Sequence, residues 1–374
     1  MSTKAPECWL NVFPLDIHNI AERSRTFEAE GWDGIGIGDS QCLCQDPFLL
    51  IALGFAATRR LRMVVAVSNV FTRHPSVLAN LAATLQDQSQ GRFVLGIGRG
   101  DSPFSHLGIA PGSFEHYERS IRKLQGYLKG EVVPFDPKDI RDGSAPISKI
   151  TLGQIPPGTE LKWLDRDIPK PALDVHTGGP QTLRMAARYA ERITLVVGAA
   201  PERIRWAVDL IHRSCEEFGR DPKEINIGAL LSVVPHPDRT RARQLGAGHQ
   251  AASMRATAIL GHYSGPYSDA DRDEIARVIS AYDMNNHVGG HTPQAGILSQ
   301  DFTDRHFVVG PPEECVAQIR EIVSLGVDRL HIATSSTHDA LRGASEAEIE
   351  ESKTVHRLLV EEVVRPLKAG AAAV

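Results

Sequence analysis

The sequence predicts an α/β fold, namely a (β/α)8 TIM barrel with insertions over its C-terminal mouth. Short runs rich in β-branched residues alternate with longer stretches whose apolar residues recur at helical spacing. Eight such strand-like runs occur along the 374 residues. Repeated strand–helix units imply parallel strands joined by right-handed crossovers, and eight of them favour a closed barrel. An open doubly wound sheet is the alternative, although it usually has fewer strands.

The predicted elements follow one another in a regular order along the chain. The strands are expected at Cys8–Phe13, Gly34–Ile37, Arg62–Val67, Arg92–Ile97, Ala172–His176, Ile193–Val197, Ile225–Leu231 and Asp328–Ala333. The helices between them are expected to include Ile17–Glu30, Pro47–Thr58, Ser76–Gln88, Pro201–Phe218 and Glu313–Leu325. We therefore treat residues 1–374 as a single barrel domain.

Two segments interrupt this alternation. Residues 131–171 are rich in proline, glycine and aspartate, and residues 261–304 are crowded with glycine, histidine and polar side chains. We expect both to lie over the C-terminal mouth, where barrel enzymes keep their chemistry. The alternative is that they are surface excursions without a function.

Composition excludes several classes of function. The formal net charge is −5, so no general basic face is available for nucleic acid or an anionic membrane. No apolar run approaches the roughly 18 to 20 residues of a membrane helix, and the first residues lack the core of a signal peptide. We expect a cytoplasmic protein with a small-molecule partner. The five cysteines are scattered, and Cys42 and Cys44 lack a second pair, so no metal site is predicted.

Glycine marks two of the predicted strand ends. Gly34-Ile-Gly36-Ile-Gly38 and Gly96-Ile-Gly98-Arg-Gly100 both resemble dinucleotide-binding fingerprints, but Pro103 follows closely and favours a longer loop. We favour a glycine-lined strand end where a flat cofactor approaches the backbone.

A third cluster and two acids complete the set of candidates. Residues 176–182 (His-Thr-Gly-Gly-Pro-Gln-Thr) end a strand and open a helix, with Pro180 placed for the first turn. Such a turn can hold a phosphate or carboxylate, although any strand-to-helix turn looks similar. Asp39 and Asp101 each follow a strand, where a carboxylate could bind hydroxyls or move a proton. Helix capping and loop ion pairs are the alternatives.

Longer motifs carry a family resemblance. Residues 62–75 (ending Thr-Arg-His-Pro) and 91–101 (beginning Gly-Arg-Phe), with residues 31–39, resemble the bacterial luciferase-like superfamily. These motifs are most similar to those of its deazaflavin branch, the enzymes that resemble methylenetetrahydromethanopterin reductase. The resemblance implies a (β/α)8 barrel, usually a homodimer, and an oxidoreductase that transfers a hydride between coenzyme F420 and a small organic substrate. An FMN-dependent luciferase-like monooxygenase is the alternative, and a cofactor-binding protein without catalysis is a third.

The resemblance also implies roles for particular residues. A non-prolyl cis peptide is implied at Ala66-Val67, behind the central ring, and Asp101 and Asp39 are the implied catalytic residues. The implied cofactor-binding residues are Asp39, Ala66, Val67, Ser68, Asn69, Gly98, Arg99, Gly100, Thr177, Gly178, Gly179, Gln181, Thr182 and Arg305. Ser40 stands where the sugar-phosphate dehydrogenase members carry a histidine, and Asn11 where the methanopterin reductases carry an acid. Neither the sugar phosphate of the first group nor the pterin of the second can therefore be assigned to this chain as its substrate.

His287 and His291 lie four residues apart, a spacing that suits two metal ligands on one helix. Gly289 and Gly290 between them make a stable helix there unfavourable. We therefore expect a flexible, substrate-facing lid that excludes water on closure.

Overall fold

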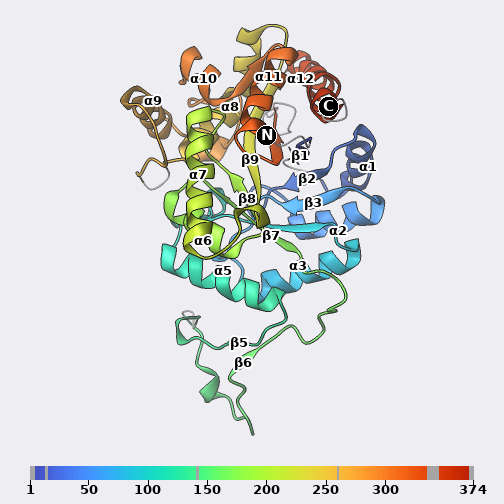
Figure 1. Cartoon of the computed structure of the whole chain (residues 1–374), viewed down its shortest axis with the longest axis vertical. Helices are drawn as coiled ribbons and strands as arrows, with labels where there is room; N and C mark the ends of the chain where they lie inside the picture. The colour runs from blue at the N-terminus through green and yellow to red at the C-terminus, as the bar shows by residue number, and fades with distance from the viewer. Residues whose placement is uncertain (1–4, 13–15, 140–142, 259–260, 335–344, 370–374) are drawn as a thin grey trace.

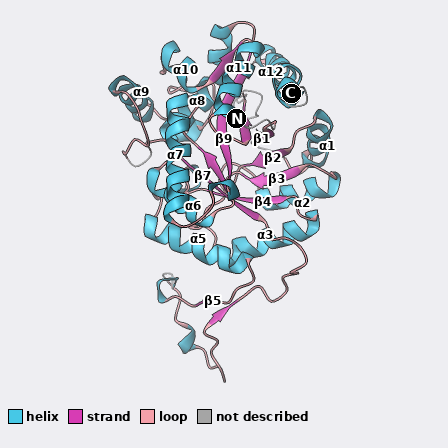
Figure 2. Ribbon diagram, in the orientation of Figure 1, coloured by secondary structure: helices cyan, strands magenta, loops and turns pink. Residues whose placement is uncertain are grey.

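Eight parallel strands close into a barrel that is surrounded by helices (Figures 1 and 2). The computed structural model describes residues 5–12, 16–139, 143–258, 261–334 and 345–369. Each strand pairs with the next and the last pairs with the first, in the order β1 (Glu7–Val12), β2 (Gly34–Ile37), β3 (Arg62–Val65), β4 (Phe93–Ile97), β7 (Ala172–Thr177), β8 (Arg192–Leu195), β9 (Asn226–Pro235) and β11 (Arg329–Ala333). The predicted barrel is confirmed. The predicted strand ends are shifted by at most a few residues, since an unpaired end residue still fits the apolar pattern; Phe13, the predicted end of the first strand, lies outside the described residues.

Helices cover the outside of the barrel. They are α1 (Ile20–Glu30), α2 (Pro47–Ala57), α3 (Pro75–Ser89), α4 (Ser102–Ser105), α5 (Phe114–Leu128), α6 (Pro180–Tyr189), α7 (Pro201–Glu217), α8 (Arg239–Ala256), α9 (Asp269–Ser280), α10 (Gln300–His306), α11 (Pro312–Ser324), α12 (Glu346–Leu358) and α13 (Arg365–Ala369). Short turns of other helix types are η1 (Pro137–Asp139), η2 (Ile147–Lys149), η3 (Pro222–Glu224), η4 (Met284–Asn286) and the π-helical η5 (Leu359–Val364). Proline in the first turn of α2, α3 and α6 explains why these helices begin where they do.

Strand β9 continues beyond the barrel. Val233–Pro235 pair with a short strand that the sequence analysis did not predict, β10 (Val308–Gly310). The N-terminal part of β9, Asn226–Ser232, pairs with β8 and β11. This extra pairing explains why β9 is longer than the predicted Ile225–Leu231.

Residues 131–171, which we call the arm, do not lie over the mouth, so that expectation is wrong. The arm follows helix α5 rather than a strand, and it contains the small antiparallel pair β5 (Val133–Pro134) and β6 (Gly158–Thr159). Lys123 of α5 binds Asp136 at 2.9 Å, and the Gln86 side chain of α3 donates to the Pro169 carbonyl at 2.8 Å. The arm is therefore attached to the outer side of α3 and α5 and extends away from the barrel (Figure 1).

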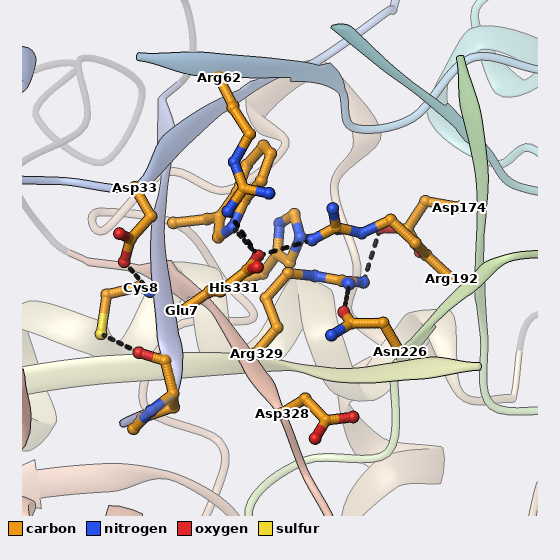
Figure 3. A network of polar contacts seen from close by, with 12 residues as sticks. Glu7, Cys8, Asp33, Arg62, Asp174, Arg192, Asn226, Asp328, Arg329 and His331 are labelled. Atoms are coloured by element: carbon orange, nitrogen blue, oxygen red, sulfur yellow. Dashed lines mark hydrogen bonds and ion pairs between the residues drawn. The ribbon is translucent and has the colours of Figure 1, made fainter. Parts of the chain in front are cut away.

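The inside of the barrel is partly polar, as Figure 3 shows. Glu7 of β1 binds Arg62 at 2.9 Å and Arg192 at 2.8 Å. Asp174 of β7 accepts a 2.7 Å hydrogen bond from Arg329 of β11, and both side chains are at most 1% exposed. Inward-facing residues of parallel strands occupy alternate positions, which brings these ion pairs together from distant parts of the sequence. We call this group the interior ion-pair network.

Candidate active site

Small residues line the mouth between β2 and β4, and we call Gly36, Ala66, Gly96 and Gly98 the glycine floor. A Cβ on Gly36 would lie 2.5 Å from the Asn11 side-chain oxygen, and one on Gly96 would lie 2.0 Å from a backbone oxygen of β3. The backbones here approach so closely that larger residues cannot be accommodated. The Val67 side chain packs against Gly98, where a Cβ would lie 2.7 Å from Val67 Cγ2. The predicted glycine-lined strand end is therefore present.

The segment that follows β3, residues 66–68, is hydrogen-bonded to β4 and to the residue after it. The Ala66–Val67 peptide is cis, as the family resemblance implied. The Ser68 N–H donates to the Gly96 carbonyl at 3.0 Å, and the Gly98 N–H donates to the Ser68 carbonyl at 2.9 Å. Ala66 and Val67 themselves are only half-buried. This segment is therefore partly exposed to solvent.

Asn69 supports the next turn of the chain. Its side-chain oxygen accepts hydrogen bonds from the backbone N–H groups of Phe71 at 3.0 Å and Thr72 at 2.9 Å. The side chain is buried, at 2% exposed. Asn69 thus holds the loop in shape, which is a use the sequence did not indicate. Its predicted contact with a cofactor stays a prediction.

Asp39 is buried at the mouth and is bound to Arg73. Burial raises the pKa of its carboxyl, although the Ser68 hydroxyl and the Arg73 guanidinium act in the opposite direction. Arg73 also binds Asp46 at 2.9 Å. The loop ion pair considered from the sequence is therefore present. Arg73 was missed, although it lies inside the Thr-Arg-His-Pro motif.

Asp101 also has an arginine partner that the sequence did not reveal. Arg255, at the end of α8, binds its carboxylate, and the Arg255 guanidinium lies 4.7 Å from the ring centre of Tyr282. Burial raises the pKa of Asp101, and Arg255 only partly offsets this effect. Asp101 precedes α4 but makes no capping hydrogen bond with its side chain. The helix-capping alternative is therefore wrong for this residue.

Arg99 hydrogen-bonds across the loop that follows β4, from residue 98 to residue 113. Its Nη2 donates to the Gly112 carbonyl at 2.8 Å, so the guanidinium holds the two ends of the loop together. Gly100 has a φ of +93°, and a Cβ there would meet the Phe104 ring at 2.1 Å. Only glycine tolerates this conformation and this contact. Both residues shape the loop that carries Asp101.

The turn between β7 and α6 has the geometry expected of an anion site. Gly179 occupies the N-cap position with no side-chain cap, and Pro180 begins the helix. The hydroxyls of Thr177 and Thr182 contact one another, and Thr182 also donates to the Gly179 carbonyl at 2.9 Å. A Cβ on Gly178 would lie 2.4 Å from the backbone oxygen of Val196, just after β8. Uncapped first-turn N–H groups attract anions, so Gln181 and Thr182 are placed to offer theirs.

Arg305 lies on α10 and has a partner within the chain. It binds Asp271 of α9 at 2.6 Å, and half of its side chain is exposed. This ion pair holds α9 and α10 together. Its predicted role near a phosphate stays a prediction.

Residues 261–304 do lie at the mouth, as expected. Arg203, at the start of α7, donates to the carbonyls of Ser264 at 2.9 Å and Pro266 at 2.8 Å. Its guanidinium also lies 3.5 Å from the ring centre of Tyr267. Within this segment the described residues form α9, η4 and α10, not a bare loop. The sequence missed Arg203, because nothing local marks a buried arginine that binds a distant loop.

The two histidines considered as a metal pair face different partners. His287 Nδ1 lies 2.6 Å from the Tyr282 hydroxyl, whereas His291 Nε2 lies 3.4 Å from Glu348. Elsewhere in the described ranges, Asp174, His176 and His331 bring three potential metal ligands within 4.8 Å of one another. Arg329 occupies the Asp174 carboxylate, so this group belongs to the interior ion-pair network.

Comparison with known proteins agrees with this geometry. The sequence model of the luciferase-like monooxygenase family matches residues 2–329. The chain belongs to that family. A 5,10-methylenetetrahydromethanopterin reductase of Methanolobus tindarius is 24% identical, over 83% of this chain and 88% of the relative. A phthiodiolone/phenolphthiodiolone dimycocerosates ketoreductase of Mycobacterium kansasii is 25% identical, over 84% of this chain and 83% of the relative. These relatives are oxidoreductases, and the predicted resemblance is confirmed.

Solved structures show the same fold. The coenzyme F420-dependent tetrahydromethanopterin reductase of Methanopyrus kandleri superposes with a TM-score of 0.69 at 20% identity, covering 98% of this chain and 100% of that one. The oxygenating constituent of 3,6-diketocamphane monooxygenase of Pseudomonas putida, in complex with FMN, has a TM-score of 0.61 at 15% identity, covering 96% and 98%. These two similar proteins use a deazaflavin and FMN, respectively. Among the described residues, no helix is long and apolar enough to span a membrane.

Proposed function

We propose that this chain is a coenzyme F420-dependent oxidoreductase that transfers a hydride between the deazaflavin and a small organic substrate. The observation that carries the proposal is the combination of the glycine floor with the uncapped turn before α6. The half-buried segment Ala66–Val67 beside this floor offers a surface on which a flat ring can lie, and a phosphate fits a free helix N-terminus. The F420-dependent reductase among the similar structures supports the same choice.

Several of the predicted residues then have a task. The backbone at Ala66, Val67 and Gly98 would lie beneath the ring, and the turn from Thr177 to Thr182 would hold the phosphate. The Asp39–Arg73 pair would orient the polar edge of the cofactor, and Asp101 would hold or relay a proton. A bound deazaflavin supplies a carbon that accepts or gives a hydride, and the protein supplies position and electrostatics.

An FMN-dependent monooxygenase is the second candidate, because the family and one similar structure use that chemistry. An FMN site needs to hold one phosphate, whereas an F420 site must also anchor the long acidic tail of that cofactor. Titration of the apo-protein with F420 and separately with FMN, followed by absorbance and fluorescence, distinguishes the two. We expect tight binding of F420; preferential binding of FMN would overturn the choice. Turnover with any electron acceptor would exclude a cofactor-binding protein without catalysis.

A matched pair of glycine variants locates the binding site in the same titration. Gly178→Ala places a Cβ 2.4 Å from a backbone oxygen at the turn before α6, so it should weaken F420 binding at least tenfold. Gly153→Ala in the arm meets nothing within 4 Å and serves as the control. Equal affinities of the two variants would contradict the phosphate site.

We also propose that the protein is a homodimer. Six large apolar side chains of the arm are between 44% and 60% exposed: Val132, Phe135, Ile150, Leu152, Ile155 and Trp163. Leu49 of α2 and Val77 of α3 are exposed as well, at 62% and 49%. Apolar surface of this kind favours association between copies. Size-exclusion chromatography with light scattering should give twice the mass of the 374-residue chain, and a monomeric mass would refute the dimer.

A further inference from the structure

A tyrosine–histidine pair at the mouth has no task in the function proposed so far. The Tyr282 hydroxyl lies 2.6 Å from His287 Nδ1, and the two rings are 5.9 Å apart. Arg255 lies over the Tyr282 ring at 4.7 Å, and the same guanidinium binds Asp101. A continuous set of contacts thus connects the predicted catalytic acid with His287.

The surroundings of His287 keep its imidazole neutral. Burial lowers the pKa of His287 to about 3, and the charges of Arg255, His249 and His106 add to that effect. Arg255 and His249 face it from α8, and His106 from the end of α4. Because the Val288 N–H and the Arg255 guanidinium both donate to the Tyr282 oxygen, we assign the hydroxyl proton to the contact with His287 Nδ1. The single proton of the neutral ring then resides on Nε2. In the described part of the chain, Nε2 has no hydrogen-bond partner, so this N–H is available to a ligand.

Tyr282 can replace a proton that His287 gives away. Burial raises the pKa of Tyr282 to about 12, and Arg255 and the Val288 N–H partly oppose that increase. The phenol is therefore protonated at neutral pH. If it loses its proton, the adjacent guanidinium balances the charge of the phenolate.

We propose that His287 and Tyr282 form a proton relay to a substrate oxygen, which makes carbonyl compounds and their alcohols the substrate class. The proposal rests on the hydride-transfer function above. The carbonyl carbon gains the hydride, and its π electrons move to oxygen, while the reduced deazaflavin is oxidised. The oxygen takes the proton from His287 Nε2, and Nδ1 takes the proton of Tyr282. The phenolate beside Arg255 then regains a proton from water. Alcohol oxidation follows the reverse path.

The kinetic test uses the full chain with reduced F420 and cyclohexanone or 2-butanone, and oxidised F420 with cyclohexanol or 2-butanol. We expect His287→Gln to lower kcat about 100-fold and Tyr282→Phe about tenfold, since a positioned acid–base group contributes about that much. The affinity for F420 should not change. His291→Gln is the matched control, because it lies in the same segment and binds Glu348 instead. Its kcat should stay within about twofold of the wild type.

A second readout does not depend on activity. In protein labelled with ¹⁵N-histidine, NMR should show His287 protonated on Nε2 only and without titration between about pH 5 and 8. Tyr282→Phe should allow the other tautomer to form. Titration of His287 near pH 6.5 would overturn the relay.

The outcomes separate the two proposals. Failure of the wild type to bind F420 overturns the proposed function, and the relay falls with it. Binding of F420 without turnover of any of these ketones or alcohols overturns the relay alone. Full activity of His287→Gln does the same.

Discussion

The interior ion-pair network and the mouth both contain buried or half-buried carboxylates bound to arginine, yet their carboxyl groups differ in pKa. Inside the barrel, Asp174 accepts hydrogen bonds from Arg329 at 2.7 Å and from Thr194 at 2.9 Å. Burial alone would raise the pKa of Asp174, but Arg329 and His176 outweigh it and hold that pKa far below its usual range. At the mouth, burial prevails, and the pKa values of Asp39 and Asp101 are raised.

The difference shows that an arginine partner alone does not fix the charge of a buried acid. Asp174 has a guanidinium, a hydroxyl and two nearby imidazoles, so its charge is fully compensated. Asp101 has one guanidinium, which is shared with the ring of Tyr282. The surroundings of Asp174 therefore favour its ionised form, whereas those of Asp39 and Asp101 shift the pKa towards the protonated form.

Removing Arg329 should produce the largest effect. Arg329→Met leaves Asp174 buried without its cation and should reduce the free energy of unfolding by about 3–5 kcal/mol. Urea denaturation measures the loss. The double variant Asp174→Asn/Arg329→Met should recover most of it, because no unpaired charge remains. A loss of less than about 1 kcal/mol in the single variant would contradict a structural role.

The contribution of the interior ion-pair network to stability should depend on pH through the ionisation of Glu7. Burial raises its pKa, but Arg192 and Arg62 outweigh this and lower it to about 2, from 4.5 in the unfolded chain. Ionised Glu7 therefore adds stability above pH 4.5, and that stability is lost as the pH falls towards 2. Glu7→Gln should cost about 2 kcal/mol at pH 7 and nothing near pH 2. The exposed Glu22→Gln is the control. An equal loss at both pH values would disprove this linkage.

At the mouth, Asp101→Asn should affect chemistry more than stability. Arg255 retains its contact with Tyr282, so the free energy of unfolding should change by less than about 1 kcal/mol. With F420 and cyclohexanone, kcat should fall about 10- to 100-fold while F420 affinity stays within about twofold. An equal loss of turnover and affinity would show a binding role instead.

Asp39→Asn should give the smallest effect. Arg73 keeps Asp46 at 2.9 Å, so no cation is left without a partner. We expect F420 affinity to fall a few-fold and the free energy of unfolding to change by about 0.5 kcal/mol or less. Fluorescence titration and thermal melting measure the two quantities. A large loss of stability would place Asp39 with the structural carboxylates.

Local patterns were enough to predict the barrel and its glycine-lined mouth. Strand runs and the turn at Gly179 depend on residues close together in the sequence, whereas the cis peptide at Ala66–Val67 was expected only from the family resemblance. The arginine partners could not be found this way, since Arg255 lies 154 residues from Asp101. One overlooked signal was available: Glu7-x-Trp9-x-Asn11, Asp174-x-His176 and Arg329-x-His331 place polar side chains at alternate strand positions. That alternation indicates a polar barrel interior.

Arg203 holds the segment of residues 261–304 over the mouth of the barrel mainly through its backbone. It belongs to helix α7, yet it holds the backbone of Ser264 and Pro266 and the ring of Tyr267. Backbone carbonyls are present whatever the side chains are, so two of these three contacts do not depend on the sequence of the segment. Apart from Asp271, Tyr282 and His287, the side chains between Tyr267 and Arg305 can therefore change while these contacts and the Arg305–Asp271 pair hold the segment in place. New substrate ranges can arise there without rebuilding the barrel.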